Sequence, residues 1–541
     1  MKNWNKIALI IFCLITFFVN NASLPTDIME QRNIVTAREM VSEGNWLVPT
    51  MNGELRLEKP PLPTWVAGGI EKIIPDSLAA QRTAAGIMGC VWTMFLFLTA
   101  RYMSKRDDFA MATVVVFLTC YNLILMGRSA TWDIYCHAFM MAGIYYFTRA
   151  IYEDHHYRQW FVIAGIFMGL SFLSKGPVSF YTLLLPYLIM LIAFPHPSMR
   201  GKWFSLSLMI ILTLVIGGWW YVYLFTVHPT EVDIVLHKES GSWSDHNVRP
   251  WYYYWRFFLE MGVWALLMLV SLAVNYWKKH ILLKREYLIT ITWAIGCLVF
   301  LSLMPEKKTR YLLPLLAPCS MVVACFIVHF NQGEKLEPFS KRLYYFNGIL
   351  LSLITLSIPI LSAQYGVKRG IINIGTETIV SILMLGITGW LVWATLQLKP
   401  FRFIKGIAAL FIVAECFLLP TIGNAFGNPK GHSINLTQND KRLQDIPFYY
   451  NKKEGLRIEL VYEAHHKILP LNLSNGIDLM HHLPCAIVTK GWAKDEIPAS
   501  ILNKIDTVSI GSFDDNKHKP SDKHYTKDLL CHMTLLKMKN K

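Results

Sequence analysis

Two groups of charged residues between positions 24 and 80 have the types and spacing expected of a site that does chemistry. Asp27 and Glu30 lie three residues apart, so on a helix both carboxylates would face the same side. A carboxylate in such a place is suited to acid–base chemistry. Further along, Lys59 precedes Pro60-Pro61, and the prolines hold it in a stiff, extended stretch suited to binding a phosphate.

Each of these features also has a purely structural explanation. Asp27 as N-cap and Glu30 at the third helical position form a capping box, which stabilises a helix without any chemistry. Lys59 is also suited to extending toward bulk lipid headgroups. The helix expected from Asp27 to Gly44 carries an apolar stripe suited to the headgroup layer of a membrane. The local sequence leaves these alternatives open.

Three other short polar segments carry cations at the ends of apolar runs. Arg128 and Asp133 lie across one tight turn, Lys175 stands at a second, and Arg310 with Tyr311 opens a third apolar run. Each would serve as an interfacial anchor. Together, on a surface that also bears two acids, such cations are suited to binding a phosphate leaving group and stabilising its negative charge.

The elements that position these residues are predicted to be membrane-spanning helices. Of the 541 residues, 53% are hydrophobic and 13% aromatic, which is too apolar for a soluble protein of this size. Apolar runs of about 17 to 25 residues predict thirteen spans, or twelve if the helices on either side of Lys175 are one broken helix. The predicted spans lie near residues 6–23, 80–100, 109–126, 133–150, 160–174, 177–194, 205–226, 256–277, 287–303, 311–329, 343–362, 374–396 and 403–423.

The distribution of Lys and Arg predicts the orientation. With the N-terminus in the cytoplasm, most basic residues fall in cytoplasmic gaps. The segment 24–80, the loop 228–254 and everything after residue 424 then lie outside the cytoplasm, and the first span is kept rather than cleaved as a signal peptide. Attraction to anionic lipid headgroups explains the net charge of +15. The sequence has no separate domain rich in basic and aromatic residues, so nucleic-acid binding is not predicted.

The composition changes sharply near residue 430. Residues 1–430 are expected to form the transmembrane domain, and residues 431–541 a small mixed α/β domain outside the cytoplasm, with β-type runs at Leu456–Tyr462 and Ala486–Thr489. The predicted fold class is therefore an all-α polytopic membrane protein of about 13 helices, with amphipathic helices in the first outer loop and this C-terminal domain. In an oxidising compartment, Cys485 and Cys531 of the tail are candidates for a disulfide.

The order of short motifs along the chain resembles a known family. In chain order the motifs are Thr36-Ala37-Arg38-Glu39-Met40, Gly44-Asn45-Trp46-Leu47-Val48-Pro49, Asn52-Gly53, Glu58-Lys59-Pro60-Pro61-Leu62, Arg128 to Asp133, Lys175-Gly176-Pro177 and Arg310-Tyr311-Leu312-Leu313-Pro314. They resemble the bacterial aminoarabinose transferases of lipid A and the related protein O-mannosyltransferases, which are C-superfamily glycosyltransferases. The resemblance covers about residues 5–425 and does not reach into the tail.

The resemblance implies an enzyme of the cell inner membrane that moves a sugar from a polyprenyl-phosphate carrier to a lipid A-like glycolipid or a protein hydroxyl. Lys59 would bind the lipid phosphate, and Asp133 would be an acid that shapes the site. The other substrate-binding candidates are Arg128, Lys175, Arg310 and Tyr311. A divalent metal held by Glu58 with His237 or His246 is also implied.

One departure from the family pattern concerns the acid. The family commonly has adjacent Asp-Glu at the start of this helix, whereas this chain has Met29-Glu30, with Asp27 one turn earlier. Either Glu30 alone or a shifted Asp27 must then act as the acid or base.

The alternative from another class is a transporter or flippase for a lipid-linked sugar. A transporter predicts ionisable groups near the bilayer midplane and two related halves. Glu260 and Glu415 are the main acids inside the predicted spans, and no internal repeat is evident. The sequence therefore favours the enzyme.

Overall fold

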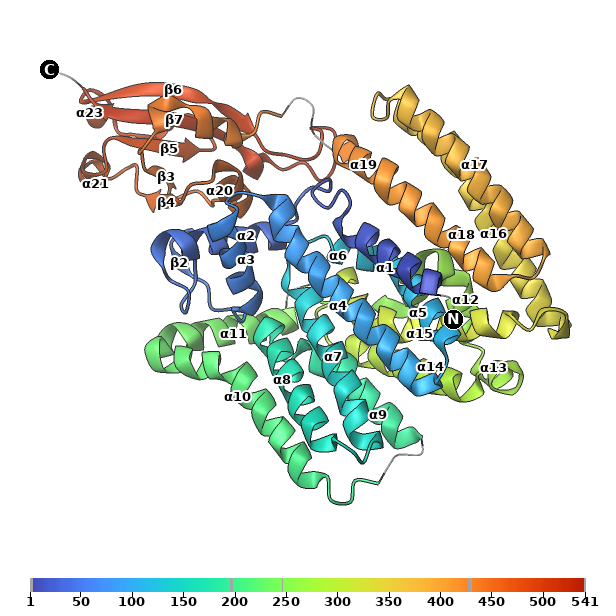
Figure 1. Cartoon of the computed structure of the whole chain (residues 1–541). Coiled ribbons are helices and arrows are strands. Elements are labelled where there is room, and N and C mark those ends of the chain that lie inside the picture. Colours follow the sequence, from blue (N-terminus) through green and yellow to red (C-terminus); the bar gives the residue numbers. More distant parts are fainter. Residues whose placement is uncertain (1–2, 195–197, 246, 427, 429–430, 540–541) are drawn as a thin grey trace. The chain divides into compact units, whose positions relative to one another are not determined.

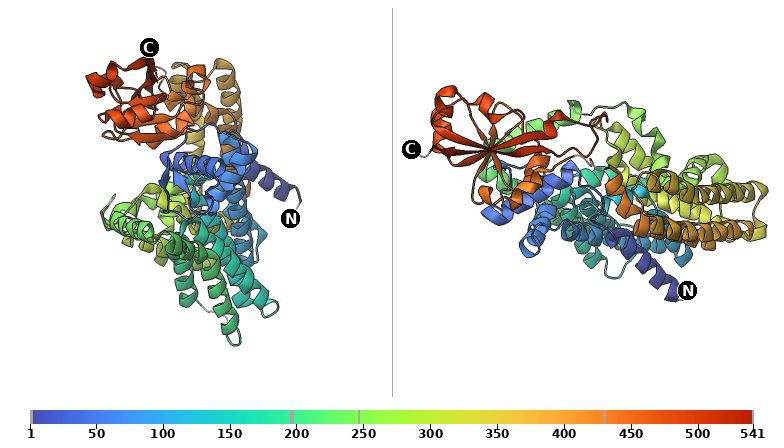
Figure 2. Two further views of the ribbon diagram at one scale, coloured as in Figure 1. Left: turned by 90° about the vertical axis from the view of Figure 1, so that its left-hand side faces the viewer. Right: turned by 90° about the horizontal axis from the view of Figure 1, so that it is seen from above.

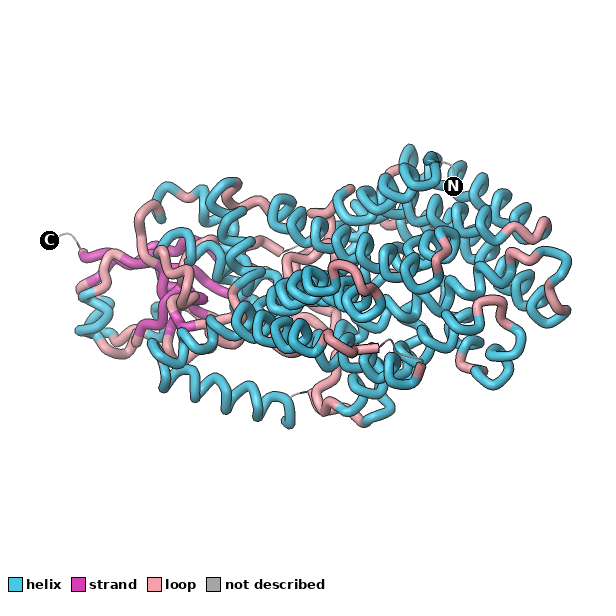
Figure 3. Tube along the Cα trace, turned by 60° about the horizontal axis from the view of Figure 1, so that its bottom comes forward, coloured by secondary structure: helices cyan, strands magenta, loops and turns pink. Residues whose placement is uncertain are grey.

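The computed structural model describes residues 3–194, 198–245, 247–426, 428 and 431–539. The chain forms two compact units. The first comprises Met1–Leu24, Leu57–Pro63 and Ser77–Thr421, and the second Pro25–Arg56, Thr64–Asp76 and Ile422–Lys541. The described part of the first unit is helical, whereas all described strands belong to the second (Figure 3). The last segment of the second unit begins at Ile422, and this unit also takes in most of the segment 25–76.

The helices of the first unit are shown in Figure 1. Their bounds are α1 Asn3–Phe18, α4 Leu78–Ser104, α5 Asp107–Leu118, α6 Tyr121–Met126, α7 Trp132–Tyr152, α8 Tyr157–Lys175, η1 Phe180–Leu184, α9 Leu185–Ala193, α10 Trp203–Val227, α11 Pro229–Asp245, η2 Trp251–Trp264, α12 Ala265–Ser271, α13 Val274–His280, α14 Lys284–Leu303, η3 Thr309–Leu315, α15 Leu316–Phe330, η4 Gly333–Lys335, α16 Pro338–Leu361, η5 Ser362–Val367, α17 Ile374–Leu396, α18 Pro400–Val413 and η6 Ala414–Leu418. Helix α19, Leu419–Phe426, crosses the boundary between the units.

Among the described residues, eight helical stretches are long and apolar enough to cross a membrane, and two shorter apolar helices accompany them. The chain is therefore a multi-pass membrane protein, although the predicted count of thirteen spans is not confirmed. Several predicted spans are interrupted in the structure. The run 109–126, for example, divides into α5 and α6 at Thr119-Cys120.

Close approach of α8 and α10 depends on glycines. A Cβ on Gly165 would lie 2.8 Å from the Met209 carbonyl oxygen, and one on Gly169 would lie 2.7 Å from the Ile216 Cβ. On the facing helix, a Cβ on Gly217 would lie 2.6 Å from the Phe172 Cβ. Small residues spaced in this way let helix backbones pack closely where burial of apolar surface supplies little driving force. This contact fixes the end of α8, which bears Lys175.

Helix α8 ends where the sequence predicted a break. Gly176 adopts φ +68°, a left-handed conformation that side chains rarely tolerate, and Pro177 follows. The helical run up to α9 therefore restarts in a new direction, and Lys175 is left at the last helical position of α8.

The second unit combines the first polar segment with the tail. Its early elements are α2 Ile28–Glu43, β1 Thr50–Met51, β2 Glu54–Leu55 and most of α3 Leu62–Ile73. The tail supplies η7 Ile434–Asn439, η8 Lys441–Leu443, β3 Phe448–Asn451, α20 Ile458–Ala464, β4 Ile468–Leu471, α21 Gly476–His481, β5 Cys485–Thr489, α22 Ala493–Glu496, α23 Ala499–Leu502, β6 Ile505–Asp514, η9 Lys527–Leu529 and β7 Leu530–Met538.

Strands β3 to β7 form one mixed sheet in the order β4-β3-β5-β7-β6. Strand β3 is parallel to β4 and β5, with Phe448 opposite Ile468 and Ala486, whereas β7 is antiparallel to β5 and β6. The strands twist relative to one another (Figure 2). The mixed α/β character predicted for the tail is confirmed.

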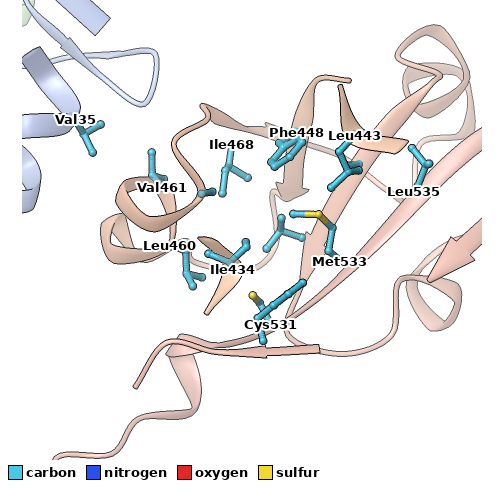
Figure 4. Close-up of a cluster of buried hydrophobic side chains, with 14 residues drawn as sticks. Val35, Ile434, Leu443, Phe448, Leu460, Val461, Ile468, Cys531, Met533 and Leu535 are labelled. Carbon is cyan, nitrogen blue, oxygen red and sulfur yellow. The ribbon is translucent and has the colours of Figure 1, made fainter. Parts of the chain in front are cut away.

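Helix α2 packs against the tail domain rather than lying in a headgroup layer as expected. Val35 is buried in one apolar cluster with Phe448, Ile468 and Met533 (Figure 4). Asn52, in the turn between β1 and β2, exchanges two 2.8 Å hydrogen bonds with the backbone of Ile468 in β4. The stripe that suggested a membrane surface therefore contacts protein.

Two expectations for the tail are wrong. The run Leu456–Tyr462 was expected to be a strand, but Ile458 begins helix α20, because the run also has the spacing of one buried helix face. Cys485 and Cys531 are free cysteines, and they belong to different apolar clusters. Side chains alternate between the two faces of a sheet, and these two cysteines lie on opposite faces.

Candidate functional site

A cavity of about 510 Å³ in the first unit brings together residues that are distant in the sequence. Its charged lining comes from the segment before α3, the start of α7, the end of α8 and the segment before η3. The predicted site residues on its wall are Glu58, Lys59, Asp133, Lys175 and Tyr311. Four of the sequence motifs therefore meet in one place.

Asp133 and Lys175 form an ion pair on the cavity wall. Asp133 lies in the first turn of α7, where the helix dipole favours negative charge, and Lys175 in the last turn of α8, where it favours positive charge. Both side chains are largely buried, with 7% and 11% exposed. Arg310 also interacts electrostatically with Asp133. The acid is therefore held between cations.

The ring of Tyr311 lies among three cations. The Nζ atoms of Lys175 and Lys308 are 5.6 Å and 5.8 Å from its centroid, and the Arg310 Cζ is 5.7 Å away. Such distances allow cation–π attraction. Lys308 also contacts the Glu306 carboxylate at 2.5 Å. Three positive charges therefore lie close to the ring of Tyr311, which lines the cavity.

Sequence reasoning missed three cavity residues. Glu306 sits in the polar segment before η3, and Tyr254 fixes that segment, since its hydroxyl donates to the Lys308 carbonyl at 3.0 Å and accepts from the Lys308 amide at 3.1 Å. His137 also lines the cavity. Of the three, only His137 had a usable signal, because it follows Asp133 by four residues and so shares its helix face.

The remaining walls of the cavity are apolar. Five of their side chains are Phe172, Tyr181, Phe225, Leu301 and Met304. An apolar cavity whose wall also bears cations suits a ligand with an anionic head and an apolar body.

Arg128 does not line the cavity, in contrast to its predicted role in substrate binding. It is 1% exposed and donates to the carbonyl oxygens of Ile15, at 3.2 Å, and Val19, and its Nη2 lies 3.7 Å from Glu415. The last carbonyls of a helix lack partners within the helix, and arginine is a common donor to them. The position of Arg128 is explained by capping α1.

Asp27 and Glu30 belong to the second unit. Asp27 is the N-cap of α2, and its carboxylate accepts hydrogen bonds from the amides of Met29, at 2.7 Å, and Glu30, at 2.9 Å. The capping interpretation of Asp27 is therefore confirmed. Glu30 is 1% exposed. A catalytic role for either acid stays a prediction.

The predicted metal ligands are not assembled in the described part of the chain. Glu58 lines the cavity, but His237 is 79% exposed on α11 with its Nδ1 3.4 Å from Asp233, and His246 lies outside the described residues. No group of three or more His, Cys, Asp or Glu within the described ranges is placed to hold a metal ion.

The fold and the cavity define a multi-pass membrane protein with charged groups in the wall of a largely apolar cavity. The family model described as dolichyl-phosphate-mannose-protein mannosyltransferase matches residues 58–221, which carry Lys59, Asp133 and Lys175. The structure resembles that of ArnT from Cupriavidus metallidurans bound to undecaprenyl phosphate, with a TM-score of 0.70, 14% identity and coverage of 99% of this chain and 98% of the other.

Two curated relatives are named undecaprenyl phosphate-alpha-4-amino-4-deoxy-L-arabinose arabinosyl transferase. The Pectobacterium carotovorum protein is 22% identical over 499 residues, which are 88% of this chain and 86% of the relative. The Shewanella sediminis protein is 24% identical over 324 residues, and the match spans 55% of each chain. The chain is therefore similar to the mannosyltransferase family model over residues 58–221, and to the arabinosyl transferases over longer stretches.

Proposed function

We propose that the protein transfers a sugar from a polyprenyl-phosphate carrier to an acceptor on the outer face of the inner membrane. The observation that carries the proposal is the cavity in which Lys59 and Lys175 stand beside apolar walls. The relatives named for an undecaprenyl-phosphate sugar donor support the same donor class.

In the proposed mechanism, the bond between the anomeric carbon and the carrier phosphate breaks as a bond from the anomeric carbon to an acceptor oxygen forms. Negative charge grows on the departing phosphate. Lys59, Lys175 and Arg310 stabilise that charge, and stabilisation is strong because the cations are fixed in place before the reaction. Asp133 keeps the Lys175 ammonium in position through their ion pair.

The proposed acid or base is Glu30. Asp27 is engaged in capping α2, so its carboxylate has a structural task. With a hydroxyl acceptor, the Glu30 carboxylate would take the proton as the new bond forms. With an acceptor phosphate that is already ionised, no proton needs to leave, and Glu30 would stabilise positive charge that develops on the sugar.

The acceptor is proposed to be a lipid A-like glycolipid, with a protein hydroxyl as the second candidate. The resemblance of the sequence motifs to the aminoarabinose transferases of lipid A favours the first candidate, and the description of the mannosyltransferase family model favours the second. The outer location follows from the distribution of Lys and Arg. A divalent metal at Glu58 stays a prediction.

Replacing Lys59 tests the proposal. In vesicles made from the membranes of the native host, Lys59→Ala should lower transfer roughly 10- to 100-fold, the range expected for a lost hydrogen bond to a charged group. Lys72→Ala is the matched control, because Lys72 is an exposed lysine at the end of α3. Mass spectrometry would follow the gain of one glycosyl unit in lipids and proteins. Equal rates for Lys59→Ala and wild type would refute the assignment.

A further inference from the structure

The cavity contains a polar side chain that the mechanism above does not use. His137 lines the cavity beside Asp133, and only 2% of its surface is exposed. Its Nδ1 is buried and has no hydrogen-bond partner within the described part of the chain. Native proteins rarely keep a buried polar atom in this condition, and each case calls for an explanation.

The neighbours of His137 do not supply that explanation. Asp133, one turn earlier on the same helix face, is paired with Lys175. Trp92 packs against the imidazole at a centroid distance of 5.5 Å, but its indole nitrogen is likewise without a partner among the described residues. The imidazole is therefore held in place by packing, while its Nδ1 makes no hydrogen bond within the described part of the chain.

The position of His137 along α7 separates it from the Asp133–Lys175 pair. Four residues of helix correspond to about 6 Å along the axis, so His137 lies that much further along α7 than the Asp133–Lys175 pair. A phosphate is satisfied by Lys59 and Lys175, and an apolar chain gains nothing from an imidazole. A sugar, in contrast, carries hydroxyl or amino groups that hydrogen-bond a neutral ring nitrogen.

We propose that His137 is a positioning residue that hydrogen-bonds a hydroxyl or amino group of the sugar carried by the lipid phosphate. This inference rests on the proposed function, because it requires a lipid-linked sugar in the cavity. The contact holds the sugar ring in one orientation relative to the phosphate, which favours attack at the anomeric carbon.

The test separates binding of the carrier from transfer of the sugar. His137→Phe and His137→Gln would be reconstituted in nanodiscs for binding of undecaprenyl phosphate, and in vesicles of native host membranes for transfer. His137→Phe should lower transfer roughly 10- to 100-fold while leaving the affinity for undecaprenyl phosphate within about twofold of wild type. Its Tm should not fall, because the substitution removes a buried atom without a partner. His137→Gln, which keeps a hydrogen-bonding group, should recover part of the rate.

His329→Phe is the matched control. His329 is equally buried, but its Nε2 lies 2.9 Å from the Ser340 hydroxyl and its Nδ1 accepts from the Leu282 amide at 3.3 Å. Its replacement should lower Tm, as expected for a histidine with a structural role. The two phenylalanine variants therefore have opposite expected effects on stability.

Three results would overturn the inference. One is transfer by His137→Phe at the wild-type rate. Another is an equal loss of undecaprenyl phosphate affinity and transfer, which would place the contact at the phosphate. The third is a large fall in Tm like that of His329→Phe, which would make His137 structural. Failure of the proposed function would look different, because the wild-type protein itself would neither bind undecaprenyl phosphate nor transfer a sugar, and the inference would fail with it.

Discussion

The ion pair between Asp133 and Lys175 gives a prediction with a defined magnitude. Lys175→Met keeps an apolar chain of similar length and removes the charge, and Asp133→Asn removes the other charge at nearly constant volume. Both partners are largely buried. Removing one partner of a buried pair typically destabilises by about 3–5 kcal/mol, because the remaining charge is buried without compensation, whereas removing both costs much less.

We therefore expect each single variant to lose about 3–5 kcal/mol and the double variant to regain at least half of that loss. Arg149 and Glu153, near the other end of α7, provide the control pair, since both are about a quarter exposed. Arg149→Met should cost about 1 kcal/mol or less.

The assay is a double-mutant cycle of reversible unfolding in mixed detergent micelles, read by tryptophan fluorescence. Undecaprenyl phosphate affinity would be measured in parallel. The double variant should be stable and still bind the lipid poorly, because it lacks the Lys175 charge. Additive single effects, with a coupling energy below about 0.5 kcal/mol, would refute the buried pair.

Three other predictions concern the framework. Glu39→Ala should lower the free energy of unfolding of the second unit by about 2–4 kcal/mol. The reason is that the Glu39 carboxylate accepts hydrogen bonds from the Thr50 hydroxyl, at 2.7 Å, and from the amides of Asn52 and Gly53. An unchanged Tm in thermal unfolding would contradict this prediction. Arg128→Ala should lower Tm strongly while any folded fraction keeps its affinity for undecaprenyl phosphate, and a selective loss of binding would show a direct role. Burial, and then the charge of Arg38, lower the pKa of His465 to about 4. Below its unfolded pKa of about 6.5, this histidine gains a proton when the protein unfolds. The free energy of unfolding should therefore fall as the pH is lowered from 6.5 to 4, by at most about 3 kcal/mol. His465→Asn should remove that dependence, and an identical pH profile in the variant would exclude His465 as its source.

The sequence was most informative where single residue types leave the backbone little choice. Gly176-Pro177 required a helix to end, and α8 does end at Lys175. A cap was one of the two interpretations that the spacing of Asp27 and Glu30 left open, and Asp27 does cap α2. The motifs before Pro60 and around Asp133 were predicted to share a site, and both line the cavity.

Other features were beyond the sequence because they depend on which distant segment covers a surface. The apolar stripe of α2 has the same spacing whether it contacts lipid or protein, and only the fold shows Val35 among tail residues. Arg128 belongs to the same sequence motif as Asp133, but its side chain donates hydrogen bonds to carbonyl oxygens at the end of α1. The roles of Glu306 and Tyr254 depend on contacts between helices that no local pattern encodes.

The most direct test of the central claim is an experimental structure of the wild-type protein in nanodiscs with undecaprenyl phosphate. We expect the phosphate within hydrogen-bond distance of the Lys59 ammonium, beside Lys175, and the polyprenyl chain along the apolar walls of the cavity. A phosphate bound elsewhere, with this cavity empty or closed, would contradict the proposed binding site.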